Sequence, residues 1–568
     1  MTPTSAQVAT SQPGQGISPG ARTLRSSSSN PRGPLLSLRL ALLLLLAFAA
    51  PFAHAPFAHA HVGSKDVFEQ ISAGPYQLFV TIRPPNVIPG IATVEVRTTG
   101  PAVSRMSITP IPLTGEASKH PPASDPMQPS TADPAFFTGS LWLMSPGSWQ
   151  VRIQLEGATG PAGASGPAGA TGPAATTGVQ TANVPVPAMP LSILPMQRPL
   201  GLTLAVLGLF LVLSMAGIVA AAVREARIAP GLTPSPDRRR RALLAATASL
   251  AVMAVFILAG DMWWNVEAAG YANAVYRPLT LSPNLSGSTL DLHITPFVDP
   301  DKPLRSRPAT DLLPDHGHLM HLYAIRMPGM DAAFHLHPTP VSPGDLRLHL
   351  PSMPPGNYRL FGDIVHSNGF PETLIANLTI PAGLPPAPLA PEDASAFPEP
   401  LNGVERTQPS SPLPATSVAV RGGTLGPAYQ LPDGYTMLWD RPAEITASTG
   451  YAFRFHLLDP AGHPASDIEP YLGMAGHAAF VKADASTFAH THPEGSAAMQ
   501  AMDLANPGSM AGMNMSETAT AITPAPHEPI SSTVTFPYGF PSPGRYRIFV
   551  QMKHGATVET GVFDAEAK

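Results

Sequence analysis

The second half of the chain contains the same histidine pattern twice, and this repeat constrains the fold more than any other feature. The first copy runs from Asp315 to His366 and the second from Tyr471 to His554. Aligned, the copies match His321 with His477, His335 with His490, His337 with His492, His366 with His554, and His318 with Met474. The surrounding residues differ freely. The repeat therefore predicts two copies of one folding unit, each with its own group of imidazoles.

Short segments of alternating polar and apolar residues predict that the folding units are built from β-strands. Tyr76–Ile82, Ala92–Arg97 and Trp149–Gln154 show this alternation, and Pro and Gly residues bound them. The 70 prolines and 48 glycines among 568 residues indicate many turns and little helix. The spacing of the strands is typical of β-sandwiches.

Two apolar segments, Leu200–Val223 and Ala242–Gly260, are long enough to cross a bilayer as helices. Arg224, Arg227 and Arg238–Arg241 lie between them, and such basic residues favour the cytoplasmic side. We therefore predict two transmembrane helices within residues 199–260, joined by a basic cytoplasmic loop at 224–241. The lipid bilayer is then a partner, and both flanking regions lie on the periplasmic (outer) side of the inner, cytoplasmic membrane.

The N-terminus has the pattern of a secretory signal, which we place within an extension at residues 1–60. Arginines precede the apolar run Leu40–Ala50, and two Ala-His-Ala steps follow, ending at Ala55 and Ala60. An uncleaved anchor is the alternative. Cleavage after Ala60 would leave His61 first, and its free amine and imidazole would chelate copper through two nitrogens.

The remaining boundaries follow from composition. Glycine recurs at every third position from Gly157 onward, which is the period of collagen. Because the repeats are too few to hold a triple helix, they predict a flexible tether. We predict a β-sandwich at 61–156, a Gly/Pro/Ala-rich linker at 157–198, a β domain with the first histidine repeat at 279–383, a Pro-rich linker at 384–414, and a β domain with the second repeat at 415–568.

The repeated histidines have the spacing of metal ligands. In a strand, residues two apart point to the same face, so the imidazoles of His335 and His337, or of His490 and His492, can reach one ion. His321 and His477 each open an apolar strand that would pair with the His-x-His segment. Three or four imidazoles at adjacent strand ends suit copper or zinc. The alternative is that they are polar strand-end residues retained after duplication.

Other candidate ligands lie outside the His-x-His segments. His366 and His554 end a later strand and could close each site from a third strand. His318 and Met474 are candidate axial or exchange ligands. We expect four other histidines at the surface or behind the ligands: His293, His316, His349 and His456.

Methionines favour copper over zinc. The chain has no cysteine, so any metal must be held by histidine, methionine and carboxylate side chains. An insertion after His492 contains Met499, Met502, Met510, Met513 and Met515 among Gly, Ala, Ser and Asn residues. Thioethers bind Cu(I) well. Packing of these methionines in a core is the alternative, but the segment has no apolar pattern. Copper is therefore the favoured metal, and zinc is the alternative.

The first β unit resembles the small immunoglobulin-like periplasmic domains of the YtkA-like and CopC-like kind. The similar segments begin at Gly74, Pro89 and Gly147. The later units resemble exported bacterial β domains with His, His-x-His-Pro and Gly-x-Tyr-Arg motifs, often encoded near copper-resistance genes. The resemblance implies three immunoglobulin-like β-sandwiches outside the membrane, in a mainly β protein with a two-helix transmembrane hairpin. CopC-like proteins also imply copper carriage through an N-terminal histidine, which His61 would supply.

The leading hypothesis is a membrane-anchored periplasmic protein that buffers or delivers copper. A non-metal envelope scaffold is the alternative, with an unidentified protein partner, and a copper-dependent oxidoreductase is a lesser one. The sequence has no nucleophile elbow, phosphate loop or paired-carboxylate motif, so we do not predict an enzyme. The net charge of −5, with no basic tract that alternates with aromatics, argues against a nucleic-acid partner.

Overall fold

The structure is a computed structural model that describes residues 65–157, 178–194, 196–298, 306–401, 427–507 and 530–568. These residues form six β-sheets and three α-helices, so the predicted mainly β class is confirmed. They divide into two units, one that holds the two long helices and one that holds all the β-strands.

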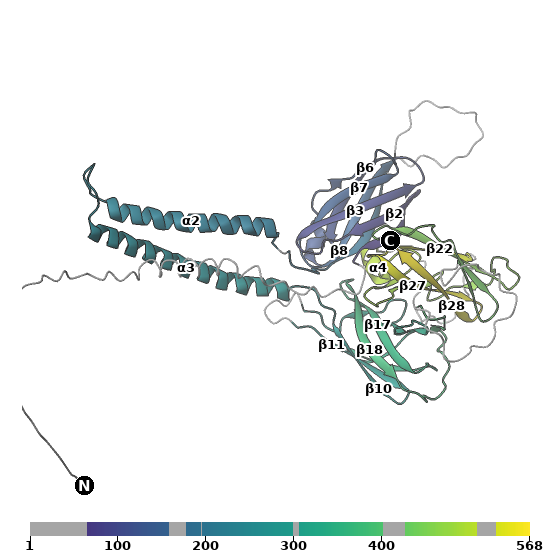
Figure 1. Ribbon diagram of the computed structural model, residues 1–568. Helices are drawn as coiled ribbons and strands as arrows, with labels where there is room; N and C mark the ends of the chain where they lie inside the picture. Colours follow the sequence, from purple (N-terminus) through teal and green to yellow (C-terminus); the bar gives the residue numbers. More distant parts are fainter. Residues whose placement is uncertain (1–64, 158–177, 195, 299–305, 402–426, 508–529) are drawn as a thin grey trace, which may run out of the picture. The chain divides into compact units, whose positions relative to one another are not determined.

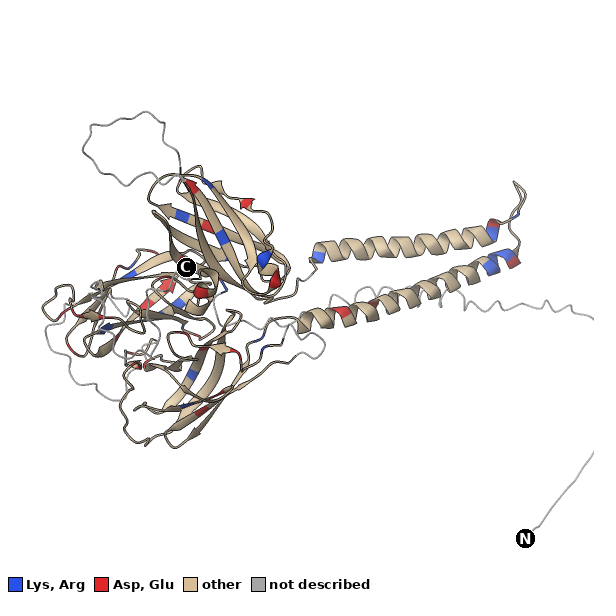
Figure 2. Cartoon of the chain, turned by 180° about the vertical axis from the view of Figure 1, so that it is seen from behind, with Lys and Arg blue, Asp and Glu red and all other residues tan. Residues whose placement is uncertain are grey.

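The first unit contains helices α2 (Arg198–Glu225) and α3 (Pro236–Asn273). Both are long and apolar enough to cross a membrane, with mean hydropathies of 2.6 and 2.4 in their most apolar windows. Figure 2 shows basic residues gathered where α2 ends and α3 begins, while the helix shafts are almost free of charge. The predicted loop at 224–241 is too long, because Arg238–Arg241 lie inside α3. Pro236 starts that helix, a position where its missing N–H costs no hydrogen bond.

Strands β1 to β9 form the first β domain (Figure 1). They are β1 (Val67–Ala73), β2 (Tyr76–Arg83), β3 (Gly90–Thr99), β4 (Val103–Pro112), β5 (Asp125–Pro126), β6 (Gln128–Pro129), β7 (Phe136–Leu143), β8 (Gly147–Gly157) and β9 (Val179–Ala188). The sheets have the orders β1-β2-β3-β7-β6 and β5-β4-β8-β9. Alternate residues such as Leu78, Val94 and Val151 are buried in one core, as the alternating pattern predicts.

The linker predicted at 157–198 is wrong in part, because β9 lies within it. β9 pairs with β8 from Gly147↔Ala188 to Glu156↔Val179. Its alternate residues Val184 and Val186 are buried in the domain core. Prolines beside them are tolerated because β9 is the edge strand of its sheet.

The second β domain contains the first histidine repeat. Its strands are β10 (Thr280–Ser286), β11 (Thr289–Thr295), β12 (Leu312–Leu313), β13 (His321–Arg326), β14 (Ala333–Leu336), β15 (Thr339–Ser342), β16 (Asp345–His349), β17 (Gly356–His366), β18 (Pro371–Ile380) and β19 (Ala394–Ala396). One sheet has the order β10-β11-β16-β15, and the other β12-β17-β13-β14-β19, with β18 also paired to β17. β19 lies inside the Pro-rich linker predicted at 384–414 and pairs with β14, so that prediction is also wrong in part.

The third β domain contains the second repeat. Its elements are β20 (Ala428–Gln430), β21 (Thr436–Trp439), β22 (Tyr451–Leu458), β23 (Ile468–Glu469), β24 (His477–Lys482), β25 (Phe488–Thr491), α4 (Met499–Ala505), β26 (Thr533–Tyr538), β27 (Gly544–His554) and β28 (Thr557–Ala567). The sheets have the orders β20-β21-β22-β26 and β23-β27-β24-β25, with β28 paired to β27. The predicted strands that open at His321 and His477, and the hairpin partners that carry His-x-His, are confirmed.

The repeat is visible in the strand registers of the last two domains. Equivalent pairs are His321↔Asp363 and His477↔Gln551, Tyr323↔His335 and Ala479↔His490, and Leu312↔His366 and Ile468↔His554. The sequence alignment of the histidines therefore agrees with their positions in the fold.

Candidate metal centre

Strand geometry places most of the predicted ligands on one face of each sheet. Residues directly opposite in an antiparallel pair, and residues two apart along a strand, point to the same face. Tyr323 pairs with His335, so His321, His335 and His337 share a face of the second domain. In the third domain Ala479 pairs with His490, which puts His477, His490 and His492 together in the same way.

His366 and His554 lie on the opposite face, so the prediction that they close the same sites is wrong. His366 is three residues beyond Asp363, the partner of His321, and His554 is three residues beyond Gln551. An odd step along a strand reverses the direction of the side chain. His366 instead contacts the carboxylates of Asp311 and Glu372, at 2.8 and 3.0 Å from its ring nitrogens.

The two histidine-bearing faces pack against each other. Tyr323 and Phe361 from the second domain share one buried cluster with Phe488 and Phe549 from the third. The rings of Phe361 and Phe488 stack with centroids 4.4 Å apart. The sequence predicted a separate site in each copy, and this expectation is corrected because both sets of imidazoles meet in one interface.

Eight histidines gather at this interface, and we call them the interdomain histidine cluster: His316, His318, His321, His335, His337, His477, His490 and His492. Ring centroids of neighbours lie between 4.2 Å (His318–His337) and 6.4 Å (His321–His477) apart. His490 joins the two sets, at 5.2 Å from His321 and 4.8 Å from His492.

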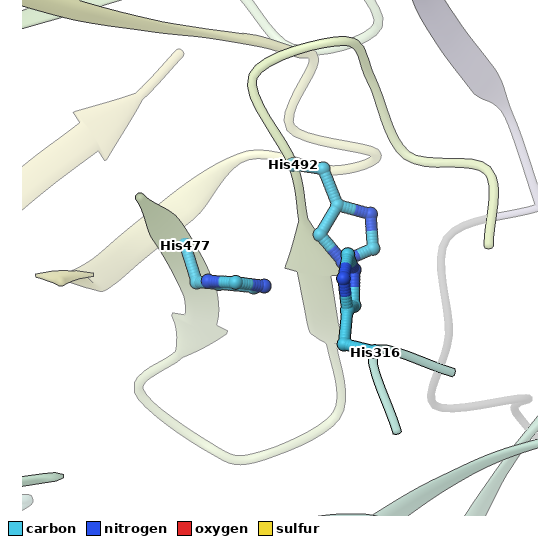
Figure 3. Close-up of side chains that lie close together, drawn as sticks. All are labelled: His316, His477 and His492. Atoms are coloured by element: carbon cyan, nitrogen blue, oxygen red, sulfur yellow. The ribbon is translucent and has the colours of Figure 1, made fainter. Parts of the chain in front are cut away.

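Two trios within the cluster have the geometry of metal ligands. His321, His335 and His337 each offer one nitrogen, and these atoms lie within 4.8 Å of one another. His316, His477 and His492 do the same. Figure 3 shows His316 reaching from the second domain toward His477 and His492 of the third. The second trio therefore takes ligands from both domains.

His316 is the member of the cluster that sequence reasoning missed. It was expected at the surface or behind the ligands, yet it is only 6% exposed and offers a ligand nitrogen to the second trio. It lies in a tight turn with left-handed backbone angles, φ 51° at His316 and 85° at Gly317. The equivalent turn of the third domain has the same shape, with φ 50° at Leu472. The alignment of His316 with a leucine hid it, whereas the His-Gly-His spacing that it shares with His318 was an available signal.

The first trio contains two lone pairs that face each other. His321 donates from Nε2 to the main-chain oxygen of Asp315 (3.0 Å), and His335 donates from Nδ1 to Gln551 Oε1 (2.8 Å). A neutral imidazole has a single ring hydrogen. His321 Nδ1 and His335 Nε2, 3.1 Å apart, are then both acceptors. Two ligands of a tetrahedral ion with bonds of about 2.0 Å lie about 3.3 Å apart, so a cation between these nitrogens resolves the conflict.

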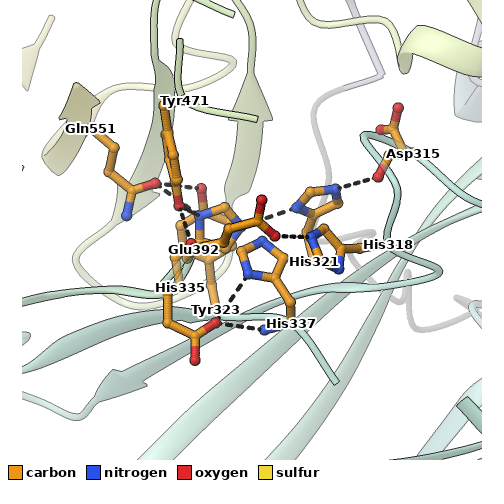
Figure 4. Close-up of polar contacts among 10 residues, drawn as sticks. Asp315, His318, His321, Tyr323, His335, His337, Glu392, Tyr471 and Gln551 are labelled. Carbon is orange, nitrogen blue, oxygen red and sulfur yellow. Dashed lines mark hydrogen bonds and ion pairs between the residues drawn. The ribbon is translucent and has the colours of Figure 1, made fainter. Parts of the chain in front are cut away.

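Carboxylates orient the rings from behind. His337 donates from Nδ1 to Asp393 (3.0 Å), which leaves the lone pair of Nε2 directed into the cluster. His318 Nε2 lies 2.9 Å from Glu392. Figure 4 shows these contacts and Tyr471, whose hydroxyl lies 3.2 Å from His335 Nδ1. Such carboxylate–histidine pairs typically fix the tautomer of a metal-binding imidazole. Sequence reasoning assigned Glu392 and Asp393 to a linker and missed both.

Burial favours the neutral form of the imidazoles in the two trios. Burial and the neighbouring His490 lower the pKa of His316 to about 3. Burial, with smaller contributions from adjacent histidines, also lowers the pKa values of His321, His335, His477 and His492 well below the usual range. Neutral imidazoles are the form that binds metals. Burial raises the pKa of the neighbouring Asp315 carboxyl to about 6.

Several ring nitrogens are buried without a hydrogen-bond partner. They are His316 Nε2, His337 Nε2, His477 Nδ1 and Nε2, His490 Nε2, and His492 Nδ1 and Nε2. A buried polar atom left unsatisfied costs about 1–3 kcal/mol. Native proteins contain few such atoms. Their concentration in one cluster is the feature that most clearly fits a bound ion.

The other predicted ligands are methionines within the described residues, or residues outside them. Met474 is buried in the turn that also contains Tyr471, whose ring lies 5.0 Å from that of His477. Met499 and Met502 lie in α4, and Met499 is 6% exposed. The expectation that their segment has no apolar pattern is therefore wrong for 499–505. His61, Met510, Met513 and Met515 fall outside the described residues.

A cavity of about 120 Å³ reaches the cluster from the junction of the three β domains. Its lining includes Trp149 of the first domain, Asp315 and Asp363 of the second, and His490 and His492 of the third. Asp363 lies 3.5 Å from His490 Nδ1. The cavity is therefore lined both by acidic side chains and by His490, which lies between the two trios.

Comparison with known proteins gives no functional assignment. Residues 297–380 and 429–568 match the family described as "Domain of unknown function (DUF8832)". Both histidine repeats lie within the matched residues. No curated protein matches the chain.

Solved structures match only weakly. A tetra-tandem repeat in the extending region of a large adhesion protein has 9% identity and a TM-score of 0.14, over 85% of this chain and 72% of that one. Trypsin-activated alpha-2-macroglobulin from Escherichia coli has 9% identity and a TM-score of 0.14, over 89% and 24%. A bacterial ice-binding adhesin has 7% identity and a TM-score of 0.13, over 87% and 97%. TM-scores this low carry no argument about fold or function.

Proposed function

We propose that this protein is a membrane-anchored metal-binding protein whose ion-binding centre is the interdomain histidine cluster. The single observation that carries the proposal is the set of buried, unpaired ring nitrogens on five converging histidines. An ion in each trio supplies a bond to the lone pairs that the protein leaves without a partner on His337 in the first trio and on His316, His477 and His492 in the second. Each of the two trios holds one ion, so the chain binds two.

Copper is the metal that we propose. Copper(II) binds a given set of nitrogen ligands more tightly than zinc does, according to the Irving–Williams order. The chain has no cysteine to favour other soft metals. The methionines of the insertion, in part buried in α4, provide thioethers for Cu(I) close in sequence to His492. Zinc remains the alternative cargo.

The proposed role is copper buffering or delivery outside the cytoplasm. From two helices of membrane-spanning length with arginines at their connecting turn, we infer that this turn lies in the cytoplasm and the β domains in the periplasm, on the outer side of the inner membrane. We regard the three β domains as immunoglobulin-like sandwiches, related to the YtkA-like and CopC-like kind. The cavity beside His490 offers a path by which copper reaches a buried site.

Copper titration of the purified full-length protein in detergent tests this function. The parent should bind two Cu(II) ions per chain. The variant His477→Ala/His492→Ala should lose one of them, because the second trio retains a single imidazole. The matched control His293→Ala/His349→Ala removes two histidines that contact Asp345 and Thr289 away from the cluster and should bind as the parent does.

Equal copper binding by the parent and the His477→Ala/His492→Ala variant would refute the proposal. Metal-free parent protein that binds neither copper nor zinc would instead favour an envelope scaffold without a metal.

A further inference from the structure

A second constellation of polar residues repeats in the last two domains, on the sheet faces opposite the histidine cluster. It consists of the histidine that ends the long strand, an aspartate before the short strand that pairs with it, and a glutamate on the following strand. The registers match: Leu312↔His366 and Ile468↔His554, and Ile364↔Glu372 and Met552↔Glu559. His366, Asp311 and Glu372 therefore correspond to His554, Asp467 and Glu559.

In the second domain an arginine neutralises this constellation. Arg307 forms an ion pair with Glu372, and its guanidinium lies over the ring of Tyr276. Glu372 also accepts hydrogen bonds from the Tyr276 hydroxyl (3.0 Å) and the Leu279 main-chain N–H (2.8 Å). His366 bridges Asp311 and Glu372. Every charge in this copy thus has a partner within the protein.

In the third domain a further carboxylate is present instead of a cation. Asp433 Oδ2 lies 2.8 Å from His554 Nε2, and ligand atoms of Asp433, His554 and Glu559 all lie within 4.8 Å of one another. Among the described residues, no lysine or arginine forms an ion pair with Asp433, Asp467 or Glu559. Burial and then the charge of Asp433 raise the pKa of Glu559 to about 7.

The ring of His554 is positioned as a metal ligand. It is 8% exposed, and its Nε2 atom is buried without a hydrogen bond even though Asp433 is close. Asp467 Oδ2 lies 3.4 Å from the other nitrogen, Nδ1, and accepts a hydrogen bond from the Tyr435 hydroxyl (3.0 Å). Tyr435 stacks on the imidazole with centroids 3.9 Å apart. A carboxylate behind one ring nitrogen directs the lone pair of the other toward an ion.

We propose that Asp433, His554 and Glu559 form a second metal site, for a divalent cation such as Mn²⁺ or Zn²⁺. Asp467 positions the imidazole of His554 from behind. Two carboxylates and one imidazole are harder ligands than the all-imidazole cluster, so they suit these cations rather than Cu(I). In the second domain the guanidinium of Arg307 pairs with Glu372 and supplies the positive charge that the cation would supply in the third domain. The site is independent of the proposed copper centre.

Binding of Mn²⁺ to the full-length protein tests this site, with free Mn²⁺ measured by electron paramagnetic resonance. The variant His477→Ala/His492→Ala, which lacks two of the three imidazoles of the histidine cluster's second trio, should still bind one Mn²⁺. Adding Asp433→Asn and Glu559→Gln to that background should weaken this binding at least 100-fold.

Two outcomes would overturn the site. One is a parent protein that binds no Mn²⁺ at all, which needs no variant to establish. The other is unchanged Mn²⁺ binding after Asp433→Asn/Glu559→Gln, with the thermal unfolding midpoint showing that the variant is folded.

Discussion

Replacing His316 by alanine is expected to remove the copper ion that the third domain holds, although His316 belongs to the second domain. His316 supplies one of three imidazoles in that trio, with ring centroids 5.1 Å from His477 and 4.9 Å from His492. Substitution of residues that hydrogen-bond to metal ligands typically lowers metal affinity 10–100-fold. The loss of a ligand itself should therefore lower the Cu(II) affinity of this trio by at least about 100-fold. A Cu(II) competition titration of the full-length protein measures the change.

His349→Ala is the matched control, since His349 is an exposed histidine of the same domain. In the His477→Ala/His492→Ala background, His316→Ala should cause no further loss of copper binding, because residues that hold one ion act as a unit. A His316→Ala protein that binds both ions with parental affinity would show that the site does not span the domains.

Arg547→Ala is expected to cause the largest loss of stability, about 3–5 kcal/mol, because it leaves a buried aspartate without its counter-charge. Arg547 donates to Asp564 from Nε (2.7 Å) and Nη2 (2.9 Å). Both residues are almost fully buried. From Nη1 it donates to the carbonyl oxygens of Met330 and Glu399, each at 2.9 Å. Arg547 therefore also joins the third domain to the second, and its loss should weaken copper binding.

Urea unfolding and copper titration of the same variants measure both effects. Arg359→Ala is the matched control: it occupies the equivalent register position, but its partner is the neutral Asn377 (2.8 Å), so no buried charge is left behind. Arg547→Met/Asp564→Leu should recover much of the stability without the bonds to Met330 and Glu399. If Arg547→Ala and Arg359→Ala lose equal stability, or copper binding is intact in Arg547→Ala, this account of the interface is wrong.

The elements that sequence predicted well are those set by local pattern. Alternation and His-x-His spacing gave the strands that begin at His321 and His477 and the shared face of each histidine pair. The same period-two rule separates His366 from Asp363, so its exclusion from the cluster could also have been predicted. Length and hydropathy alone identified the two membrane-length helices.

The assembly of the cluster could not be predicted because it depends on packing between domains. Aromatic residues such as Phe361 and Phe488 are compatible with a domain core or with an interface, and only their stacking shows which. Glu392 and Asp393 lie in a Pro-rich segment whose composition indicates a linker, yet they contact His318 and His337. β9 was hidden in the same way, because its prolines disguise an edge strand.

If imidazoles from two domains form one metal centre, the electron paramagnetic resonance spectrum of the copper-loaded parent should show it. The trios are adjacent, since the ring centroids of His316 and His321 lie 5.9 Å apart. Two bound Cu(II) ions should therefore show imidazole nitrogen couplings and a magnetic interaction with each other. Copper signals that show oxygen ligands alone, or two ions without any mutual interaction, would contradict the account.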